Sequence, residues 1–277
     1  MLAAAAQPWA SLVERFSLHE RTVVVTGAGG LLGRRHCAAL AAAGAHVVAV
    51  DLDPALCDAT ARAVGTGCQA FSADVTEIES LRGLRDFLLD VRGRLDVLVN
   101  NAAIDDKVEG AQGAAVPFEQ FPLAAWEHAL RVNVTGVFLC CQVLGEAMLR
   151  AGRGSIVNVA STYALVAPDP SLYLRPDGTP LLHKSPAYAT SKAALLGLTR
   201  HLAAAWGARG VRVNTLSPGG VQNGQEDWFV ERYAARTPLG RMAAPDDYSG
   251  ALLFLASEAS AYMTGANLVV DGGFTAW

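Results

Sequence analysis

The sequence has few of the features that mark several classes of protein. Only three of its 22 basic residues are lysines, the net charge is −4, and no basic run occurs, so no nucleic-acid partner is expected. The apolar start at Met1–Ala6 contains no basic residue and polar residues soon follow, which argues against a cleaved signal peptide. No uninterrupted apolar run reaches 18 residues, so no membrane partner is expected. These absences predict a cytoplasmic protein.

Cysteine and histidine are also sparse. The five cysteines form an odd count with no C-x-x-C pair, which indicates free thiols in a reducing compartment. The six histidines are scattered without metal-ligand spacing, so no metal site is predicted. By contrast, 52% of the 277 residues are hydrophobic and 17% are charged, which provides enough apolar material for a sizeable core.

Short apolar runs alternate with longer amphipathic stretches, a pattern typical of parallel strands joined by helices. Seven runs predict strands: Thr22–Thr26, Ala45–Val50, Gln69–Ser72, Leu95–Val99, Ser155–Val159, Val211–Leu216 and Asn267–Val270. Four longer stretches predict helices: Leu32–Ala43, Trp126–Met148, Tyr188–Ala208 and Asp246–Ser257. We therefore expect an α/β protein with a single-domain Rossmann fold, a doubly wound parallel sheet of about seven strands with helices on both faces.

Residues 1–20 are predicted to be an N-terminal extension, and residues 21–277 a single domain. Two stretches interrupt the alternation, a proline-rich loop insertion at 164–186 and a substrate loop at 218–239. Long loops in a compact α/β domain are usually lids or binding loops. The many donors and acceptors of the insertion favour a hydroxylated or charged substrate, and the alternative is a solvated loop or a subunit contact.

A glycine-rich segment, T-G-A-G-G-L-L-G at Thr26–Gly33, follows the first strand and runs into a helix. A pyrophosphate needs glycines for the tight turn and for close backbone approach, and the helix N-terminus offers free N–H groups. Asp51 closes the second strand, where a carboxylate accepts hydrogen bonds from the adenosine ribose and repels a 2′-phosphate, so NAD is predicted rather than NADP. Asp53 is a nearby alternative, but it lies past the strand. The residues of the glycine-rich segment predicted to bind this cofactor are Gly27, Gly30, Leu32 and Gly33.

The most specific pattern lies later in the chain. It consists of four polar residues, Asn133, Ser161, Tyr188 and Lys192, the last two in Y-A-T-S-K. Around them stand N-N-A-A at 100–103, F-S-A-D-V at 71–75, V-N-T-L-S-P-G-G-V at 213–221 and a closing T-G-A-N-L-V-V-D-G-G. This ordered set covers nearly the whole chain and resembles the short-chain dehydrogenase/reductase superfamily. The resemblance implies an oxidoreductase that transfers a hydride between NAD and a secondary alcohol or ketone.

Tyr188 and Lys192 are four residues apart, hence on one helix face. A tyrosine pKa of about 10 is too high for a base near neutral pH, and a nearby ammonium and the positive nicotinamide are expected to lower it. Tyr188 then takes the alcohol proton, while Ser161 orients the substrate oxygen. The resemblance implies that Lys192 also holds the nicotinamide ribose and that Asn133 holds a water in a proton relay. The alternative for Asn133 is a satisfied buried polar residue.

The resemblance extends to further cofactor contacts. It places Asp74 and Val75 beside the adenine, Asn101 along the adenine ribose, and the backbone of Val221 at the nicotinamide carboxamide. Three residues depart from the family pattern: Leu31 and Ala103 stand where glycine is usual, and Asn223 stands where threonine is often found.

The glycine spacing T-G-x-x-G-x-x-G is also used by extended members of the superfamily, often sugar-nucleotide epimerases or dehydratases with tightly bound NAD. That function is one alternative, although the chain leaves no room for their C-terminal substrate domain. A non-catalytic NAD-sensing module is another, against which the intact catalytic set argues. The insertion resembles one in members that act on sugars, so the predicted substrate is a sugar, sugar acid or polyol derivative. A homo-oligomer, either a dimer or a homotetramer, is expected.

Overall fold

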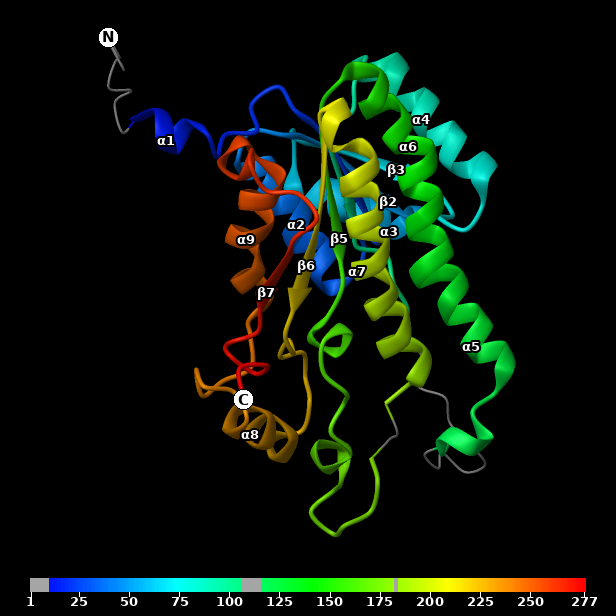
Figure 1. The fold of residues 1–277 in the computed structure, drawn as a ribbon, viewed down its shortest axis with the longest axis vertical. Coiled ribbons are helices and arrows are strands. Elements are labelled where there is room, and N and C mark those ends of the chain that lie inside the picture. Colours follow the sequence, from blue (N-terminus) through cyan, green and yellow to red (C-terminus); the bar gives the residue numbers. More distant parts are fainter. Residues whose placement is uncertain (1–9, 106–115, 182–183) are drawn as a thin grey trace.

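The computed structural model of the chain describes residues 10–105, 116–181 and 184–277, so residues 1–9 of the predicted extension and 182–183 of the insertion lie outside the described residues. Within these ranges, seven parallel strands form one sheet in the order β3-β2-β1-β4-β5-β6-β7 (Figure 1). In chain order they are β1 Thr22–Thr26, β2 His46–Asp51, β3 Cys68–Ser72, β4 Val97–Asn100, β5 Gly154–Val159, β6 Val211–Pro218 and β7 Asn267–Val270. The predicted doubly wound α/β fold is confirmed.

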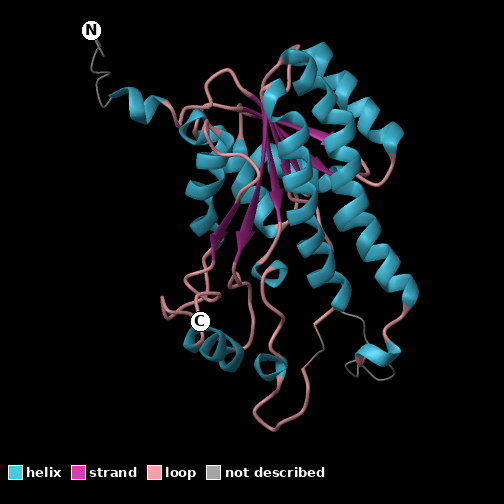
Figure 2. Cartoon of the chain, in the orientation of Figure 1, coloured by secondary structure: helices cyan, strands magenta, loops and turns pink. Residues whose placement is uncertain are grey.

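Helices cover both faces of this sheet (Figure 2). One face packs against α2 and α9, and the other against α4, α6 and α7. The inner strands read as continuous apolar runs because both their faces are buried. The helix bounds are α1 Ala10–Glu14, α2 Leu31–Ala42, α3 Pro54–Val64, α4 Ile78–Arg92, α5 Leu123–Leu130, α6 Val137–Ala151, α7 Pro186–Trp206, α8 Asp227–Ala235 and α9 Ser249–Ala256.

The predicted helices omit α3 and α4, and the predicted loop at 218–239 contains α8. In α4 the buried residues are three leucines at helical spacing among charged neighbours, so its apolar pattern is faint. The helix predicted at Trp126–Met148 is longer in the structure. It runs from Leu123 to Ala151, because a π-helical turn at Arg131–Gly136 joins α5 to α6. As a unit, Leu123–Ala151 is long and apolar enough to cross a membrane, and half of its apolar stretch is buried in this fold. Packing in the core accounts for that hydropathy.

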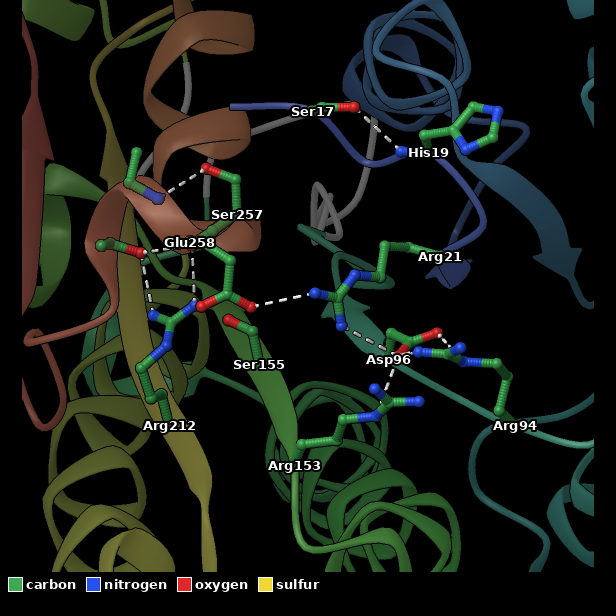
Figure 3. A network of polar contacts seen from close by, with 12 residues as sticks. Ser17, His19, Arg21, Arg94, Asp96, Arg153, Ser155, Arg212, Ser257 and Glu258 are labelled. Atoms are coloured by element: carbon green, nitrogen blue, oxygen red, sulfur yellow. Dashed lines mark hydrogen bonds and ion pairs between the residues drawn. The ribbon is translucent and has the colours of Figure 1, made fainter. Parts of the chain in front are cut away.

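A polar network ties together the edge of the sheet at which the strands begin (Figure 3). The buried Asp96 precedes β4 and accepts hydrogen bonds from the N–H of Thr22 at 2.9 Å and from Arg94 at 2.7 Å. Arg21 bridges Asp96 and Glu258 at 3.3 and 3.1 Å. These contacts fix the amino ends of β1 and β4. The loops that follow the strands lie at the opposite end of the sheet, where the strands have their carboxyl ends.

Candidate active site

The glycine-rich turn between β1 and α2 is shaped by close backbone contacts. Gly27 has a φ of +64°, and a Cβ there would lie 2.7 Å from the Cα of Ala102. A Cβ at Gly33 would lie 2.1 Å from the carbonyl oxygen of Gly27, so both positions require glycine. A Cβ at Gly30 would meet the same oxygen at 3.3 Å, a milder contact. Leu31 begins α2 with 39% of its surface exposed, so the turn closes without a glycine at that position.

Asp51 and Arg34 hold Gly29 from its two sides. The Asp51 carboxylate, at the end of β2, accepts a hydrogen bond from the N–H of Gly29 over 2.9 Å. The guanidinium of Arg34, on α2, donates to the Gly29 carbonyl over 2.8 Å. Asp51 therefore lies beside the turn, where its contact with the ribose is predicted. Arg34 is a positive neighbour to which the sequence analysis assigns no role.

Asp74 and Val75 lie in the loop after β3. One carboxylate oxygen of Asp74 accepts hydrogen bonds from the N–H and the hydroxyl of Thr76, at 2.8 and 2.7 Å. Val75 packs against the π-helical turn, where a Cβ at Gly136 would lie 2.9 Å from its Cγ2. This loop is therefore fixed by its own contacts as well as being placed for the predicted adenine site.

The two asparagines of the N-N-A-A segment act differently. The side-chain amide of Asn101 donates to the carbonyls of Thr26 and Gly27 at 2.9 and 3.1 Å, so it braces the glycine-rich turn from the neighbouring strand. Asn100 is buried and donates to the side chain of Asn158 over 2.8 Å. Asn101 therefore has a structural role in addition to its predicted ribose contact.

Helix α7 carries the predicted acid–base pair. It begins at Pro186, and the hydroxyl of its N-cap residue Ser185 accepts a hydrogen bond from the N–H of Tyr188 over 3.4 Å. A capping serine followed by proline is a strong signal for a helix start. The Lys192 ammonium lies 5.7 Å from the centre of the Tyr188 ring and donates to the carbonyl of Val159 over 2.8 Å. Lys192 is thus anchored to the end of β5 beside Tyr188.

Burial dominates the acid–base properties of this pair. Burial raises the pKa of Tyr188, the Asp105 carboxylate raises it further, and a hydrogen bond with Ser161 acts in the opposite direction. Burial lowers the pKa of Lys192 to about 8, against the influence of Asp105. In the protein without a bound cofactor, lost hydration thus has the largest effect on the Tyr188 pKa. The expected lowering of this pKa by Lys192 together with a bound nicotinamide stays a prediction.

Ser161 follows β5 and opens a short 3₁₀ turn, in which its hydroxyl accepts a hydrogen bond from the N–H of Tyr163 over 3.2 Å. Ser161 and Tyr188 line one cleft of about 630 Å³. Leu32 and Val221 line it as well. The cleft thus joins the predicted catalytic residues to residues of the predicted cofactor site, at the ends of the strands.

Asn133 lies in the π-helical turn and is fully buried. Its amide oxygen accepts a hydrogen bond from the N–H of Ile104 at 2.8 Å, and its nitrogen donates to the Ile104 carbonyl at 2.9 Å and to Ser191 at 3.0 Å. It therefore joins the loop after β4 to α7 through the neighbour of Lys192 rather than through Lys192 itself. These contacts match the alternative of a satisfied buried polar residue, and π-helical turns are frequent at functional sites.

The described part of the insertion, residues 164–181 and 184–186, lies beyond the ends of β5 and β6, and its first half packs on α8 (Figure 1). Asp169 pairs with Arg236, and the rings of Tyr173 and Phe229 lie 5.6 Å apart. Three residues of the insertion line the cleft: Tyr173, Leu181 and Lys184. This placement favours a substrate-binding loop over a solvated one.

The loop after β6 closes the cleft with its main chain. The side chain of Gln225 donates to the Val221 carbonyl over 2.9 Å and accepts from the N–H of Asn223 over 2.6 Å. Gln225 therefore fixes the backbone that is predicted to contact the nicotinamide. The sequence gives no sign of this role, because nothing in the local pattern distinguishes Gln225 from other loop residues.

Asp105 is a further residue of the cleft for which the sequence pattern suggests no role. It forms an ion pair with Lys184, which the sequence analysis names only among the polar residues of the insertion. A signal was available, since Asp105 follows N-N-A-A by one residue and Lys184 directly precedes the cap of α7.

The crevice between the loops that follow β1 and β4 meets the requirements of a dinucleotide site. The strand order reverses between β1 and β4, so the loops leaving these strands diverge at that point. The glycine-rich turn presents the first turn of α2 to the same crevice, where its N–H groups have no partner within the helix. The adjoining cleft offers the Tyr188 phenol and the Ser161 hydroxyl, with the Lys192 ammonium buried beside the phenol. Such a set can hold and move one proton at the oxygen of an alcohol. Among the described residues no cluster of histidine, cysteine or acidic side chains suits a metal.

Several known proteins are similar to this chain in sequence and in fold. A family model described as short chain dehydrogenase matches residues 21–173, and one described as enoyl-(acyl carrier protein) reductase matches residues 177–275. D-threitol dehydrogenase of Mycolicibacterium smegmatis is 38% identical over 94% of this chain and 95% of its own length. Galactitol 2-dehydrogenase (L-tagatose-forming) of Cereibacter sphaeroides is 35% identical over 95% and 98%. The structure of a gluconate 5-dehydrogenase from Burkholderia cenocepacia, in complex with NADP and tartrate, superposes with a TM-score of 0.82 at 31% identity over 96% and 99%.

Proposed function

Since this chain belongs to the short-chain dehydrogenase family, we propose that it is an NAD-dependent dehydrogenase that interconverts an alcohol and a ketone on a polyol, sugar or sugar acid. Activity on CH–OH groups is the common property of the dehydrogenases to which it is similar. The observation that carries the proposal is the grouping of Ser161 and Tyr188 in one cleft, with Lys192 buried beside them.

The bound nicotinamide supplies or accepts the hydride. The Ser161 hydroxyl is placed to donate a hydrogen bond to the substrate oxygen and so to orient it, and the Tyr188 phenol holds at its Oη the proton that this oxygen gains or loses. Because the pKa of Tyr188 is raised, the phenol is protonated at neutral pH and ready to give its proton to a ketone. Oxidation of an alcohol needs the phenolate, which the Lys192 ammonium favours, so higher pH assists that direction.

The residues that would hold the cofactor follow the crevice. The turn from Gly27 to Gly33 suits the pyrophosphate, and Asp51 suits the adenosine ribose. A 2′-phosphate would meet the Asp51 carboxylate, which supports NAD here, although the gluconate 5-dehydrogenase structure holds NADP. The remaining proposed contacts are Leu32, Asp74, Val75, Asn101, Tyr188, Lys192 and Val221.

The substrate class rests on the cleft and on the relatives. Polar side chains of the insertion line the cleft, as a hydroxylated substrate requires. Two of the relatives are named for threitol and galactitol and a third for gluconate. All three are named dehydrogenases, which favours net oxidation over the epimerase or dehydratase alternative. The homo-oligomer and the cytoplasmic location stay predictions.

A substrate screen tests this function. The purified chain is mixed with NAD or NADP and with a panel of polyols, sugars, sugar acids and monohydric secondary alcohols, and reduced nicotinamide is followed by its absorbance. We expect reduction of NAD with at least one polyhydroxylated substrate and none in the Tyr188→Phe variant. Cofactor binding measured by calorimetry without turnover of any panel member would contradict the proposal and favour a cofactor-sensing module.

A further inference from the structure

Lys184 and Asp105 form an ion pair inside the cleft, although 79 positions separate them in the sequence. The Lys184 ammonium lies 4.8 Å from the centre of the Tyr188 ring and 5.9 Å from that of Tyr163. Its side chain is 19% exposed and that of Asp105 is 36% exposed, so both charges are accessible from the cleft. The pair therefore lies next to the proposed proton donor, where the carbons beyond the reacting carbon of a substrate would lie.

Each member of the pair adjoins a residue that is fixed by hydrogen bonds. Asp105 directly follows Ile104, whose N–H and carbonyl are both bound by the buried side chain of Asn133. Lys184 directly precedes Ser185, the N-cap residue of α7, which carries Tyr188. Both charges are thus positioned through their neighbours, as a specificity determinant requires.

The charges of the described cleft residues do not suit an acid. The ionisable side chains that line it, apart from tyrosines, are one ammonium and two carboxylates: Lys184, Asp105 and Glu226. Lys184 is compensated by Asp105, and Glu226 accepts a hydrogen bond from the indole of Trp228 over 2.7 Å. A substrate carboxylate would compete with Asp105 for Lys184 and meet like charge.

We propose that the Lys184–Asp105 pair sets the substrate class of the cleft, binding two adjacent hydroxyls of a neutral polyol or sugar and disfavouring sugar acids. The inference rests on the proposed function and narrows its substrate. An ammonium has three donors and a carboxylate about four acceptor sites, so each member keeps capacity after pairing with the other. One hydroxyl accepts from Lys184 while its neighbour donates to Asp105, and bonds to charged groups are the stronger kind.

Wild-type substrate preference is the first test. Glucitol is compared with gluconate, and butane-1,2,3-triol with butan-2-ol, each by kcat/KM with NAD. We expect the neutral polyol to exceed the acid by at least about tenfold and the triol, which keeps two adjacent hydroxyls beyond the reacting carbon, to exceed the monohydric alcohol by a similar factor. A preference for gluconate would overturn the inference and leave the dehydrogenase function intact. Absence of turnover with every alcohol would instead overturn the proposed function.

Lys184→Met removes the ammonium and keeps the length of the side chain. We expect kcat/KM for the polyol to fall about 10- to 100-fold, chiefly through KM, with a loss at least about tenfold smaller for butan-2-ol. Lys184→Arg keeps a donor and should recover most of the polyol activity. The matched control is Arg200→Met, which removes a positive charge from the exposed face of α7 and should leave both substrates unaffected. Equal losses on both substrates would show that Lys184 acts through Tyr188 and would overturn the inference.

Asp105→Asn leaves Lys184 without its charged partner. We expect kcat/KM for gluconate to rise and that for glucitol to fall, which moves their ratio by at least about tenfold toward the acid. Calorimetric affinity for NAD and the melting temperature establish that the variant is folded. A folded variant with an unchanged ratio would show that the pair does not read substrate charge.

Discussion

The Lys192 ammonium donates a hydrogen bond to the main-chain carbonyl of Val159 over 2.8 Å, at a position that is 3% exposed. Burying this charge costs stability, and the lowered pKa of Lys192, about 8 against an ordinary 10.5, expresses that cost. The protein thus keeps a destabilising ammonium beside Tyr188, as expected of a residue retained for function.

Lys192→Met should therefore stabilise the fold while abolishing activity. The lowered pKa of Lys192 corresponds to a destabilisation of the folded protein by about 3 kcal/mol, which the substitution removes. About 1 kcal/mol of this gain is lost, because the Val159 carbonyl is left without a partner. Below pH 8 the lysine is charged in both the folded and the unfolded chain, so the variant has its full advantage. Between about pH 8 and 10.5 the folded chain loses its proton first, and the advantage disappears. Urea unfolding at several pH values measures it, and a variant less stable at pH 7 would contradict the argument.

Tyr188→Phe removes only the phenolic oxygen, so the variant should fold and should still bind the cofactor. Loss of a positioned acid or base costs about 10²–10⁴ in rate, and we expect a loss in that range with the best substrate. In the unmodified protein the raised pKa of Tyr188 predicts that alcohol oxidation increases with pH from about pH 7 without reaching a plateau by about pH 10. Steady-state kinetics across that range test both points. A variant that keeps more than about a tenth of the rate would exclude Tyr188 as the proton carrier.

Asp51→Ala should weaken the preference for NAD over NADP. The carboxylate that repels a 2′-phosphate is removed, and Arg34, which contacts the other side of Gly29, becomes the dominant charge beside the turn. The double variant Asp51→Ala with Arg34→Met should lose any affinity gained for NADP. Calorimetric titration of both cofactors into each variant provides the measurement. Tighter binding of NADP than NAD by the unmodified protein would reverse the assignment.

Asn133→Ala should destabilise the fold and should also weaken substrate binding in the cleft, through Ile104. The substitution leaves the N–H and carbonyl of Ile104 without their buried partner, at a cost of about 2–4 kcal/mol. Because Asp105 follows Ile104, its pair with Lys184 should loosen and KM for a polyol should rise more than kcat falls. Thermal unfolding and steady-state kinetics separate this from a proton-relay role, which would lower kcat with little effect on KM or stability.

Local features of the sequence determined the sheet, the cofactor turn and the acid–base helix. Strands β1 and β7 begin and end where predicted, because runs of β-branched and apolar residues bounded by turns have few other structures to adopt. Gly33 is dictated by its close approach to the Gly27 carbonyl and Gly27 in part by its positive φ, and Tyr188 with Lys192 share a helix face through the helical repeat. These features depend on short-range sterics, which a sequence carries in full.

Tertiary structure alone decided which charges meet and how strongly burial acts on them. The Lys184–Asp105 pair, the anchoring of Lys192 to Val159 and the clamp of Asn133 on Ile104 join residues that are distant in the chain. The raised pKa of Tyr188 could not be predicted from the sequence, because hydration depends on every element that packs over the phenol, and no local pattern records that. Electrostatic and solvation effects act through space rather than along the chain, so only the assembled fold gives the cleft its charge and its acid.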